Sequence, residues 1–200
     1  MVFLWRGLDN RFFYDTLLNM KIILVRHGQT DANKNGILQG QEVDISLNET
    51  GIQQVEKSAF ILAGKSINSI ISSPLKRALQ TAEIISRNLS KNIELDDRLK
   101  EFSYGSLAGK TWMEIEQETG DGAMREKDQN LIFNYHPYGG ESIEDVKTRV
   151  IAFMKDVQTR YLNKSILITT HGGIIDVVHM LLPQKEKVEV DNATIHEFEV

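Results

Sequence analysis

The sequence predicts an α/β fold, arranged as a three-layer α/β/α sandwich with a mostly parallel central sheet. Short apolar segments alternate along the chain with longer segments whose apolar residues recur at helical spacing. The first apolar segment, residues 21–25, is continuously apolar after Lys21, as expected for a strand buried on both faces. Strands that are separated by helices connect in parallel, and the helices then cover both faces of the sheet.

The strands of this sheet can be placed one by one, with helical segments between them. They are expected at residues 21–25, 68–72, 93–95, 165–170 and, as an edge strand, 195–200. Between the first two strands, Asn48 is a typical capping residue at the start of a helix. The apolar face of that helix recurs at helical spacing and consists of Ile52, Val55, Ala59 and Leu62.

The later helices also have recognisable starts and ends. Pro74 suits the opening of the helix after the second strand, and residues 111–118 predict a short helix. Residues 142–145 resemble a capping box, with Asp in place of the usual Glu, at the start of a long helix. After the fourth strand, residues 173–182 predict a largely buried helix that is ended by Pro183.

Length and composition indicate one globular domain. The chain has 200 residues, 41% of them hydrophobic, which is enough to bury one core. It contains no cysteine, which excludes disulfides, thiol catalysis and cysteine-bound zinc. A net charge of −5 with scattered bases is unlike a nucleic-acid binder or a protein of anionic membrane surfaces. No apolar run reaches the roughly 18 residues that span a bilayer.

Residues 1–19 are interpreted as an N-terminal extension, and residues 20–200 as the domain, because Met20 directly precedes the first strand. The extension starts apolar but reaches Arg6 and Asp9 too early for a signal-peptide core. We therefore expect a cytoplasmic location. No feature of the sequence predicts an oligomeric state.

The candidate site lies where three predicted strands end. In open α/β sheets, ligands bind beyond the carboxyl ends of the strands. Arg26 and His27 follow the first strand, Arg77 comes shortly after the second, and His171 follows the fourth. A glycine follows each of the two histidines, which lets the backbone turn tightly and approach a ligand. The fold is therefore expected to bring two arginines and two histidines to one edge of the sheet.

Two guanidinium and two imidazole groups describe an anion site, and phosphate fits it best. Guanidinium groups bind phosphate oxygens through paired hydrogen bonds and stay charged at any working pH. A neutral imidazole can attack phosphorus, which splits one difficult step into two, and nearby positive charge favours the neutral form. We expect no metal ion and no other cofactor, because the two histidines have no evident third partner and two arginines repel a cation.

The segment LVRHGQT, residues 24–30, resembles the signature of the histidine phosphatase superfamily, the phosphoglycerate mutase-like proteins. The resemblance covers nearly all of residues 21–200 and implies a phosphoglycerate mutase-like fold. One further motif departs from the family pattern at Ser46, where proline is usual. The further motifs, in the order typical of the family, are residues 44–51 (DISLNETG), 72–82 (SSPLKRALQTA), 99–109 (LKEFSYGSLAG), 139–142 (GGES) and 171–173 (HGG).

The resemblance implies a role for each matched residue. His27 is expected to be the nucleophile that becomes phosphorylated, while Arg26, Arg77 and His171 hold the transferring phosphoryl oxygens. Glu101 is expected to protonate the leaving alkoxide and then to deprotonate the incoming water. The remaining residues expected to bind the phosphate group are Thr30, Asn33, Gln39 and Gly172. The histidines interpreted as structural are His136, His179 and His196.

The resemblance leaves two reaction classes open, and the residues favour a phosphatase over a mutase. Phosphoglycerate mutases typically have an HGN segment, whereas this chain has Gly173 in place of the asparagine. They also carry a longer insertion between the acid-bearing loop and the histidine of that segment, whereas the interval from Glu101 to His171 is short here. We therefore expect metal-independent hydrolysis of a small phosphate ester through a phosphohistidine. A phosphoglycerate mutase is the alternative, followed by a non-catalytic phospho-ligand binding module. Residues 120–138 are expected to form much of the wall over the leaving group, but their side chains do not indicate which substrate binds there.

Overall fold

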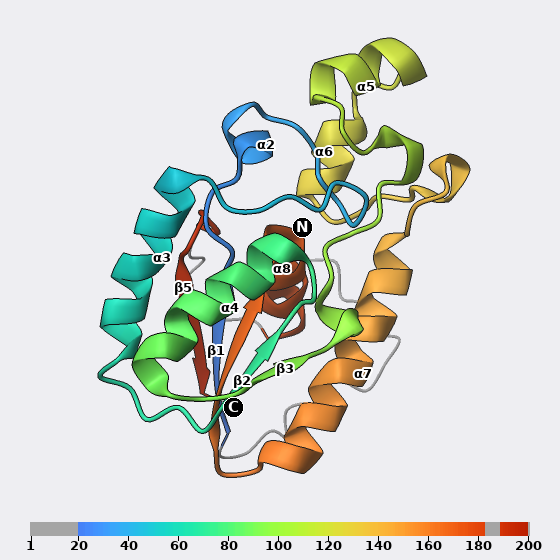
Figure 1. Ribbon diagram of the computed structural model, residues 1–200. Helices are drawn as coiled ribbons and strands as arrows, with labels where there is room; N and C mark the ends of the chain where they lie inside the picture. The colour runs from blue at the N-terminus through green and yellow to red at the C-terminus, as the bar shows by residue number, and fades with distance from the viewer. Residues whose placement is uncertain (1–19, 183–188, 200) are drawn as a thin grey trace.

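The computed structural model describes residues 20–182 and 189–199, and it confirms the predicted α/β fold. The described strands form one sheet in the order β3-β2-β4-β1-β5 (Figure 1). The first four in this order are parallel, and β5 runs antiparallel to β1 at the edge. These strands are β1 (Lys21–Arg26), β2 (Ser69–Ser72), β3 (Ile93–Leu95), β4 (Ser165–Thr170) and β5 (Ile195–Glu199).

The central strands end level with one another, and this alignment creates the candidate site. Arg26 at the end of β1 lies opposite Thr170 at the end of β4. Ser72 at the end of β2 lies opposite Thr169 of β4. The residues that follow each strand therefore leave the sheet side by side. The apolar residues in the middle of β1 and β4 are fully buried, which explains their lack of polar alternation.

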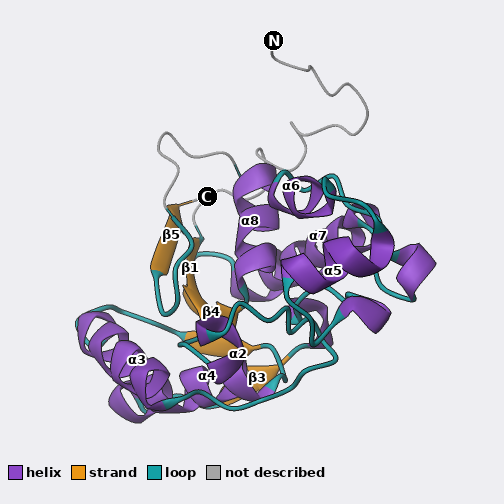
Figure 2. Ribbon diagram, turned by 90° about the horizontal axis from the view of Figure 1, so that it is seen from above, coloured by secondary structure: helices purple, strands orange, loops and turns teal. Residues whose placement is uncertain are grey.

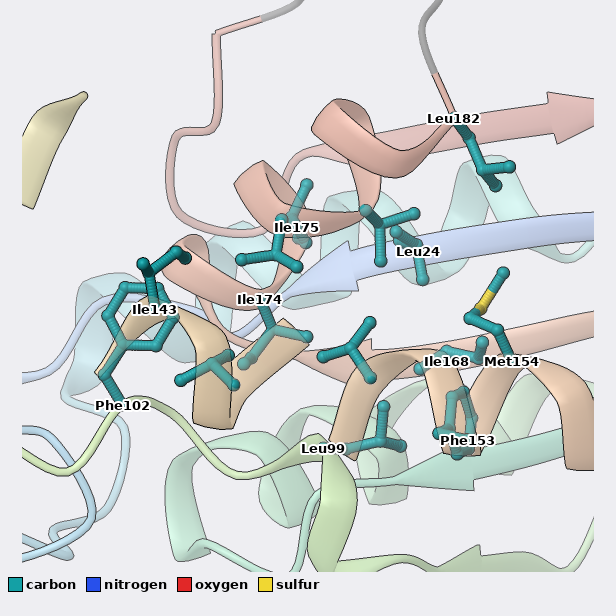
Figure 3. Packing of buried hydrophobic residues seen from close by; sticks show 14 of the residues in the cluster. Leu24, Leu99, Phe102, Ile143, Phe153, Met154, Ile168, Ile174, Ile175 and Leu182 are labelled. Atoms are coloured by element: carbon teal, nitrogen blue, oxygen red, sulfur yellow. The ribbon is translucent and has the colours of Figure 1, made fainter. Parts of the chain in front are cut away.

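Helices cover both faces of the sheet, as the three-layer prediction requires (Figure 2). One face packs on α3 (Glu49–Leu62) and α4 (Lys76–Leu89) through a cluster that includes Val55 and Ile85. The opposite face packs on α7 (Ile143–Tyr161) and α8 (Gly172–Leu181). Figure 3 shows this second core, in which side chains of both helices meet the sheet residues Leu24 and Ile168.

Short helices lie beyond the carboxyl ends of the strands (Figure 1). Among them α5 was predicted, whereas no helix was predicted in the segments that form the others, because one or two turns leave no periodic pattern. These short helices lie at the same end of the sheet as the candidate residues (Figure 1). Their bounds are α2 (Asp31–Lys34), η1 (Asp97–Leu99), η2 (Gly105–Leu107), α5 (Trp112–Thr119), α6 (Met124–Gln129) and η3 (His136–Tyr138).

The caps of the predicted helices are confirmed, with one difference at α4. Asn48 caps α3 by accepting the Gly51 N–H, and Ser142 opens α7 with the expected capping box. Helix α4 begins at Lys76 rather than at Pro74, because Leu75 is still extended and serves as its N-cap. The predicted end at Pro183, the extension 1–19 and residue 200 lie outside the described residues. No helix within the described ranges has the length and apolarity to cross a membrane.

Candidate active site

The ends of β1, β2 and β4 bring the two predicted histidines together. The His27 N–H donates to the Thr170 carbonyl at 2.9 Å, which extends the pairing of β1 with β4 beyond the strands. The Ser73 N–H donates to the Thr169 carbonyl at 3.0 Å and extends β2 in the same way. The rings of His27 and His171 consequently lie with their centroids 5.2 Å apart.

The imidazole of His27 is buried and held in one tautomer. Its Nδ1 lies 2.8 Å from the Gly28 carbonyl oxygen, and because a carbonyl only accepts, Nδ1 carries the proton. In the neutral ring Nε2 then carries the lone pair. Burial lowers the pKa of His27 well below its usual value, and the charges of Arg77 and Arg26 lower it further. His27 is therefore a neutral ring whose Nε2 carries an available lone pair.

The backbone after His27 needs glycine for space. A Cβ on Gly28 would lie 2.5 Å from the Gly51 carbonyl oxygen and 2.8 Å from a methyl group of Val55, at the start of α3. The Gly28 N–H donates to the Thr81 hydroxyl at 3.2 Å, and this hydroxyl donates in turn to the Arg77 carbonyl on α4. The turn that orients His27 is thus packed between two helices.

His171 is completely buried and lies at the N-terminus of α8. Its Nε2 lies 2.8 Å from the hydroxyl oxygen of Ser73, and this oxygen accepts the Leu75 N–H at 3.3 Å. Burial lowers the pKa of His171 well below its usual value, with Arg77 as the main charge that adds to this effect. Both rings of the pair are therefore neutral.

The two arginines are fixed by backbone carbonyls. Arg77 is 1% exposed, and its terminal nitrogens donate to the carbonyls of Gly40 at 2.7 Å and Val43 at 3.2 Å. Arg26 donates to the Val190 carbonyl at 2.6 Å. Burial lowers the pKa of both guanidinium groups, yet an arginine keeps its charge at any working pH.

Unsatisfied nitrogens around His27 indicate an anion. Nε of Arg26, Nε of Arg77 and Nδ1 of His171 are buried without a hydrogen-bond partner in the described part of the chain. Unsatisfied buried polar groups are rare, since each costs about 1–3 kcal/mol. Three of them on cationic or imidazole side chains fit one ligand that supplies several acceptor oxygens and negative charge. A phosphoryl group has these properties.

The predicted pocket residues Thr30, Asn33 and Gln39 are connected to one another. The Thr30 hydroxyl lies 3.0 Å from Asn33 Oδ1 and 3.1 Å from Gln39 Oε1. Thr30 also caps α2 through the Asn33 N–H, so the helix fixes this cluster. Asn192, which the sequence did not point to, donates to the His27 carbonyl at 3.1 Å and to Asn33 at 3.4 Å.

Glu101 reaches the same end of the sheet from the opposite side. Its Oε1 accepts the Phe102 N–H at 3.1 Å, and its Oε2 lies 3.4 Å from the N–H of Gly173. A Cβ on Gly173 would come within 2.8 Å of Oε1 and 2.5 Å of the Phe102 ring. Gly172, also predicted, is the first residue of α8, and a Cβ there would lie 3.4 Å from Arg26 Nε.

Residues 120–138 contribute aromatic side chains beside this carboxylate. Phe133 and Tyr135 are buried against Phe102 and Tyr104, and Tyr104 packs beside the Gly40 backbone that holds Arg77. The charged side chains Arg125 and Lys127, which we included in the wall, are exposed. That this segment contacts the leaving group stays a prediction.

The remaining histidines lie in separate contacts. His136 pairs with Asp145 at the start of α7 at 2.5 Å, and His179 lies 2.9 Å from His196 between α8 and β5. Within the described ranges, no three His, Asp or Glu side chains are grouped as a metal site would require.

The sequence did not indicate several residues that hold the site. Ser73 and Thr81 lie in a recognised motif but had no assigned role. The sequence contained one indication that Arg149 on α7 is not a surface residue, because it lies next to Val150 in the buried stripe of that helix. Asn192 had no signal.

Comparisons with known proteins show which proteins this chain is similar to. A metal-independent phosphoserine phosphatase of Arabidopsis thaliana is 33% identical over 174 residues, which are 82% of this chain and 69% of that protein. Phosphoglycerate mutase-like protein 4 of the same plant is 30% identical over 194 residues, covering 95% and 84%. A solved mycobacterial glucosyl-3-phosphoglycerate phosphatase in complex with VO3 is 26% identical with a TM-score of 0.77, covering 88% and 90%.

The family profile described as histidine phosphatase superfamily (branch 1) matches residues 22–200. This range contains every predicted site residue and all but two of the described residues, Met20 and Lys21. The phosphatase names among the relatives support the expected enzyme class, a phosphoric monoester hydrolase. On this match, the chain belongs to the histidine phosphatase superfamily.

Proposed function

We propose that this protein hydrolyses small phosphomonoesters, without a metal ion, through a phosphohistidine on His27. The observation that carries the proposal is a neutral imidazole whose Nε2 keeps its lone pair, beside unsatisfied nitrogens of Arg26, Arg77 and His171. A nucleophile and a set of donors for phosphoryl oxygens are the two parts that phosphoryl transfer needs. The two guanidinium groups supply the positive charge that a divalent cation supplies in other phosphatases.

The first step transfers the phosphoryl group to the protein. Nε2 of His27 attacks phosphorus and forms the N–P bond while the ester P–O bond breaks. Arg26, Arg77 and the Nδ1–H of His171 bind the phosphoryl oxygens and stabilise their charge. Glu101, in its protonated form, donates a proton to the departing alkoxide.

The second step releases inorganic phosphate. Glu101, now a carboxylate, accepts a proton from a water molecule whose oxygen attacks the phosphohistidine. The N–P bond breaks and its electron pair returns to Nε2. Hydrogen phosphate leaves, with His27 again neutral and Glu101 again protonated by the proton that it took from water. A mutase returns the phosphoryl group to a second hydroxyl of the same substrate and excludes this water.

The substrate class is a small phosphate ester. Similar proteins are named for phosphoserine and for glucosyl-3-phosphoglycerate, which share a phosphomonoester and differ in the leaving group. The aromatic cluster beside Glu101 gives the leaving group an apolar, well-packed neighbour, while the phosphate end has no feature that distinguishes one ester from another.

The proposal is tested by phosphate release from a panel of phosphomonoesters, with and without EDTA. Wild-type protein is expected to turn over in EDTA, and His27→Ala to lose about 10⁵-fold or more in kcat, because a residue that acts covalently is hard to replace. The exposed His136 serves as the matched control, since His136→Asn removes a histidine outside the site. Acid quench of the wild-type reaction is expected to trap an acid-labile phosphoprotein.

Two outcomes contradict the proposal. Turnover that survives in His27→Ala shows that another group attacks phosphorus. Interconversion of 3-phosphoglycerate and 2-phosphoglycerate without release of phosphate assigns the protein to the mutases.

A further inference from the structure

We propose that Arg149 and Glu141 form a clamp that positions Glu101 for its proton transfers. Here "acid loop" means residues 98–103, and "clamp" means the Arg149–Glu141 pair. Arg149 lies on α7 and Glu141 just before it, so neither belongs to a strand end that forms the phosphate site. The inference rests on the proposed function, because it concerns how the proposed acid is held.

The guanidinium of Arg149 uses all its N–H groups, and three of them bind the acid loop. Nη1 donates to the carbonyls of Arg98 at 2.8 Å and Lys100 at 2.6 Å, and Nη2 donates to that of Glu101 at 3.1 Å. The other two N–H groups grip the Glu141 carboxylate, at 2.8 Å and 3.0 Å. An arginine has five such donors in a fixed plane, so its position dictates the path of the loop.

Glu141 holds the other side of the same loop. Its Oε2 accepts the Ser103 N–H at 2.9 Å and the side-chain amide of Gln41 at 3.0 Å. Gln41 follows Gly40, whose carbonyl binds Arg77. The clamp therefore fixes the backbone before and after Glu101 and links it to the segment that holds the phosphate-binding arginine.

The side chain of Glu101 depends on this backbone. Its carboxylate contacts the N–H of the next residue, Phe102, at 3.1 Å, and the N–H of Gly173 at 3.4 Å. The neighbours Leu99 and Phe102 point into the core in Figure 3, each 2% exposed. Burial of these two anchors keeps the loop folded, while the clamp sets its exact path. A proton transfer needs the acid within hydrogen-bond distance of the leaving oxygen, so a shift of about 1 Å costs about 10²-fold in rate.

The test uses the leaving group to separate positioning from folding. An alkyl phosphate needs a proton on its leaving oxygen, whereas p-nitrophenyl phosphate releases a stable phenolate that needs little help. The quantity kcat/KM includes the steps up to departure of the leaving group. Glu101→Gln defines the signature of a lost acid. Arg149→Lys and Glu141→Gln are the test variants, and Arg160→Lys is the control, since Arg160 lies on the same helix in a surface ion pair with Glu94.

The clamp variants are expected to reproduce the signature of Glu101→Gln. Their kcat/KM for an alkyl phosphate falls by about 10²-fold, while that for p-nitrophenyl phosphate changes by a few-fold at most. With p-nitrophenyl phosphate, kcat also falls and a burst of nitrophenolate precedes the steady state, because hydrolysis of the phosphohistidine still needs the base. Millimolar guanidinium is expected to restore part of the lost activity in Arg149→Ala, as replacement of the missing group.

Three results overturn the inference. Equal losses on both esters in Arg149→Lys and Glu141→Gln, accompanied by a lower Tm, show that the pair supports the fold in general. Unchanged activity on both esters shows that the loop holds Glu101 without the clamp. A wild-type protein that hydrolyses neither ester overturns the proposed function and the inference with it, whereas the first two results leave the function standing.

Discussion

The two sides of the candidate site are built in different ways. The phosphate side consists of residues that directly follow parallel strands, and His27 and Ser73 there continue the hydrogen bonds of the sheet. The acid side consists of a loop held from outside, by Arg149 on α7 and by Glu141 before it. The hydrogen bonds of the sheet set the geometry of the phosphate side, whereas contacts between distant parts of the chain set that of the acid side.

This difference indicates which side sets the chemistry and which adapts to the substrate. In the proposed function, the phosphate side binds the phosphoryl oxygens that every phosphomonoester shares, so a rigid sheet edge would serve all of them. The acid side lies next to the aromatic cluster of Phe102, Tyr104, Phe133 and Tyr135, where the leaving group differs between esters. Variants on the two sides should therefore differ in how their effects depend on the leaving group.

Among the variants that compare the two sides, the largest effect is expected on the phosphate side, from Arg77→Lys. A lysine keeps the charge but cannot hold the carbonyls of Gly40 and Val43 and still present a second donor to the phosphoryl group. We expect kcat/KM to fall by about 10²–10³-fold, by the same factor for alkyl and p-nitrophenyl esters. The exposed neighbour Lys76, changed to Arg, provides the matched control. A loss that depends on the leaving group contradicts the division into two sides.

A smaller effect is expected where the two sides meet, from Gly173→Ala. The added methyl group would lie 2.5 Å from the Phe102 ring and 2.8 Å from Glu101 Oε1, so the acid loop must move. We expect a loss of about 1–3 kcal/mol in the free energy of unfolding, although alanine favours a helix, and a loss of activity that is larger for alkyl esters.

The matched control is Gly64→Ala, because a Cβ on Gly64 meets nothing within 4 Å. Denaturant unfolding and kcat/KM on both esters are measured for both variants. A stable Gly173→Ala protein with wild-type selectivity contradicts the tight contact between α8 and the acid loop.

The same difference explains how much of the molecule the sequence predicted. The positions of the strands and the residues that follow them can be read from local sequence patterns. His27, Arg77 and His171 could therefore be assigned to one site. The clamp could not be predicted, because Arg149 binds three backbone carbonyls, which leave no trace in residue identity. Short helices such as α2 and the approach of Asn192 also depend on tertiary contacts rather than on periodicity.

The two sides also differ in the sign of their pH dependence. Burial lowers the pKa of His171 well below 6.5, so below that pH the unfolded chain binds a proton that the folded chain does not. Stability from this group is therefore present above pH 6.5 and falls as the pH is lowered. Burial raises the pKa of Asp128, which accepts a hydrogen bond from Tyr135, from 3.8 to about 6. Stability from this carboxyl is present below its unfolded value and is lost as the pH rises toward 6.

The smallest expected effect is a change in the slope of stability against pH between about pH 5 and 6. Each group changes this slope by at most about 1.4 kcal/mol per pH unit, with opposite signs. His171→Asn is expected to make the free energy of unfolding rise less steeply with pH. Asparagine does not titrate, so the unfolded variant no longer binds a proton at this position that the folded chain lacks. Asp128→Asn is expected to make it rise more steeply. Urea unfolding at closely spaced pH values measures both slopes against Arg160→Lys, and slopes that move in the same direction refute the opposite linkage of the two sides.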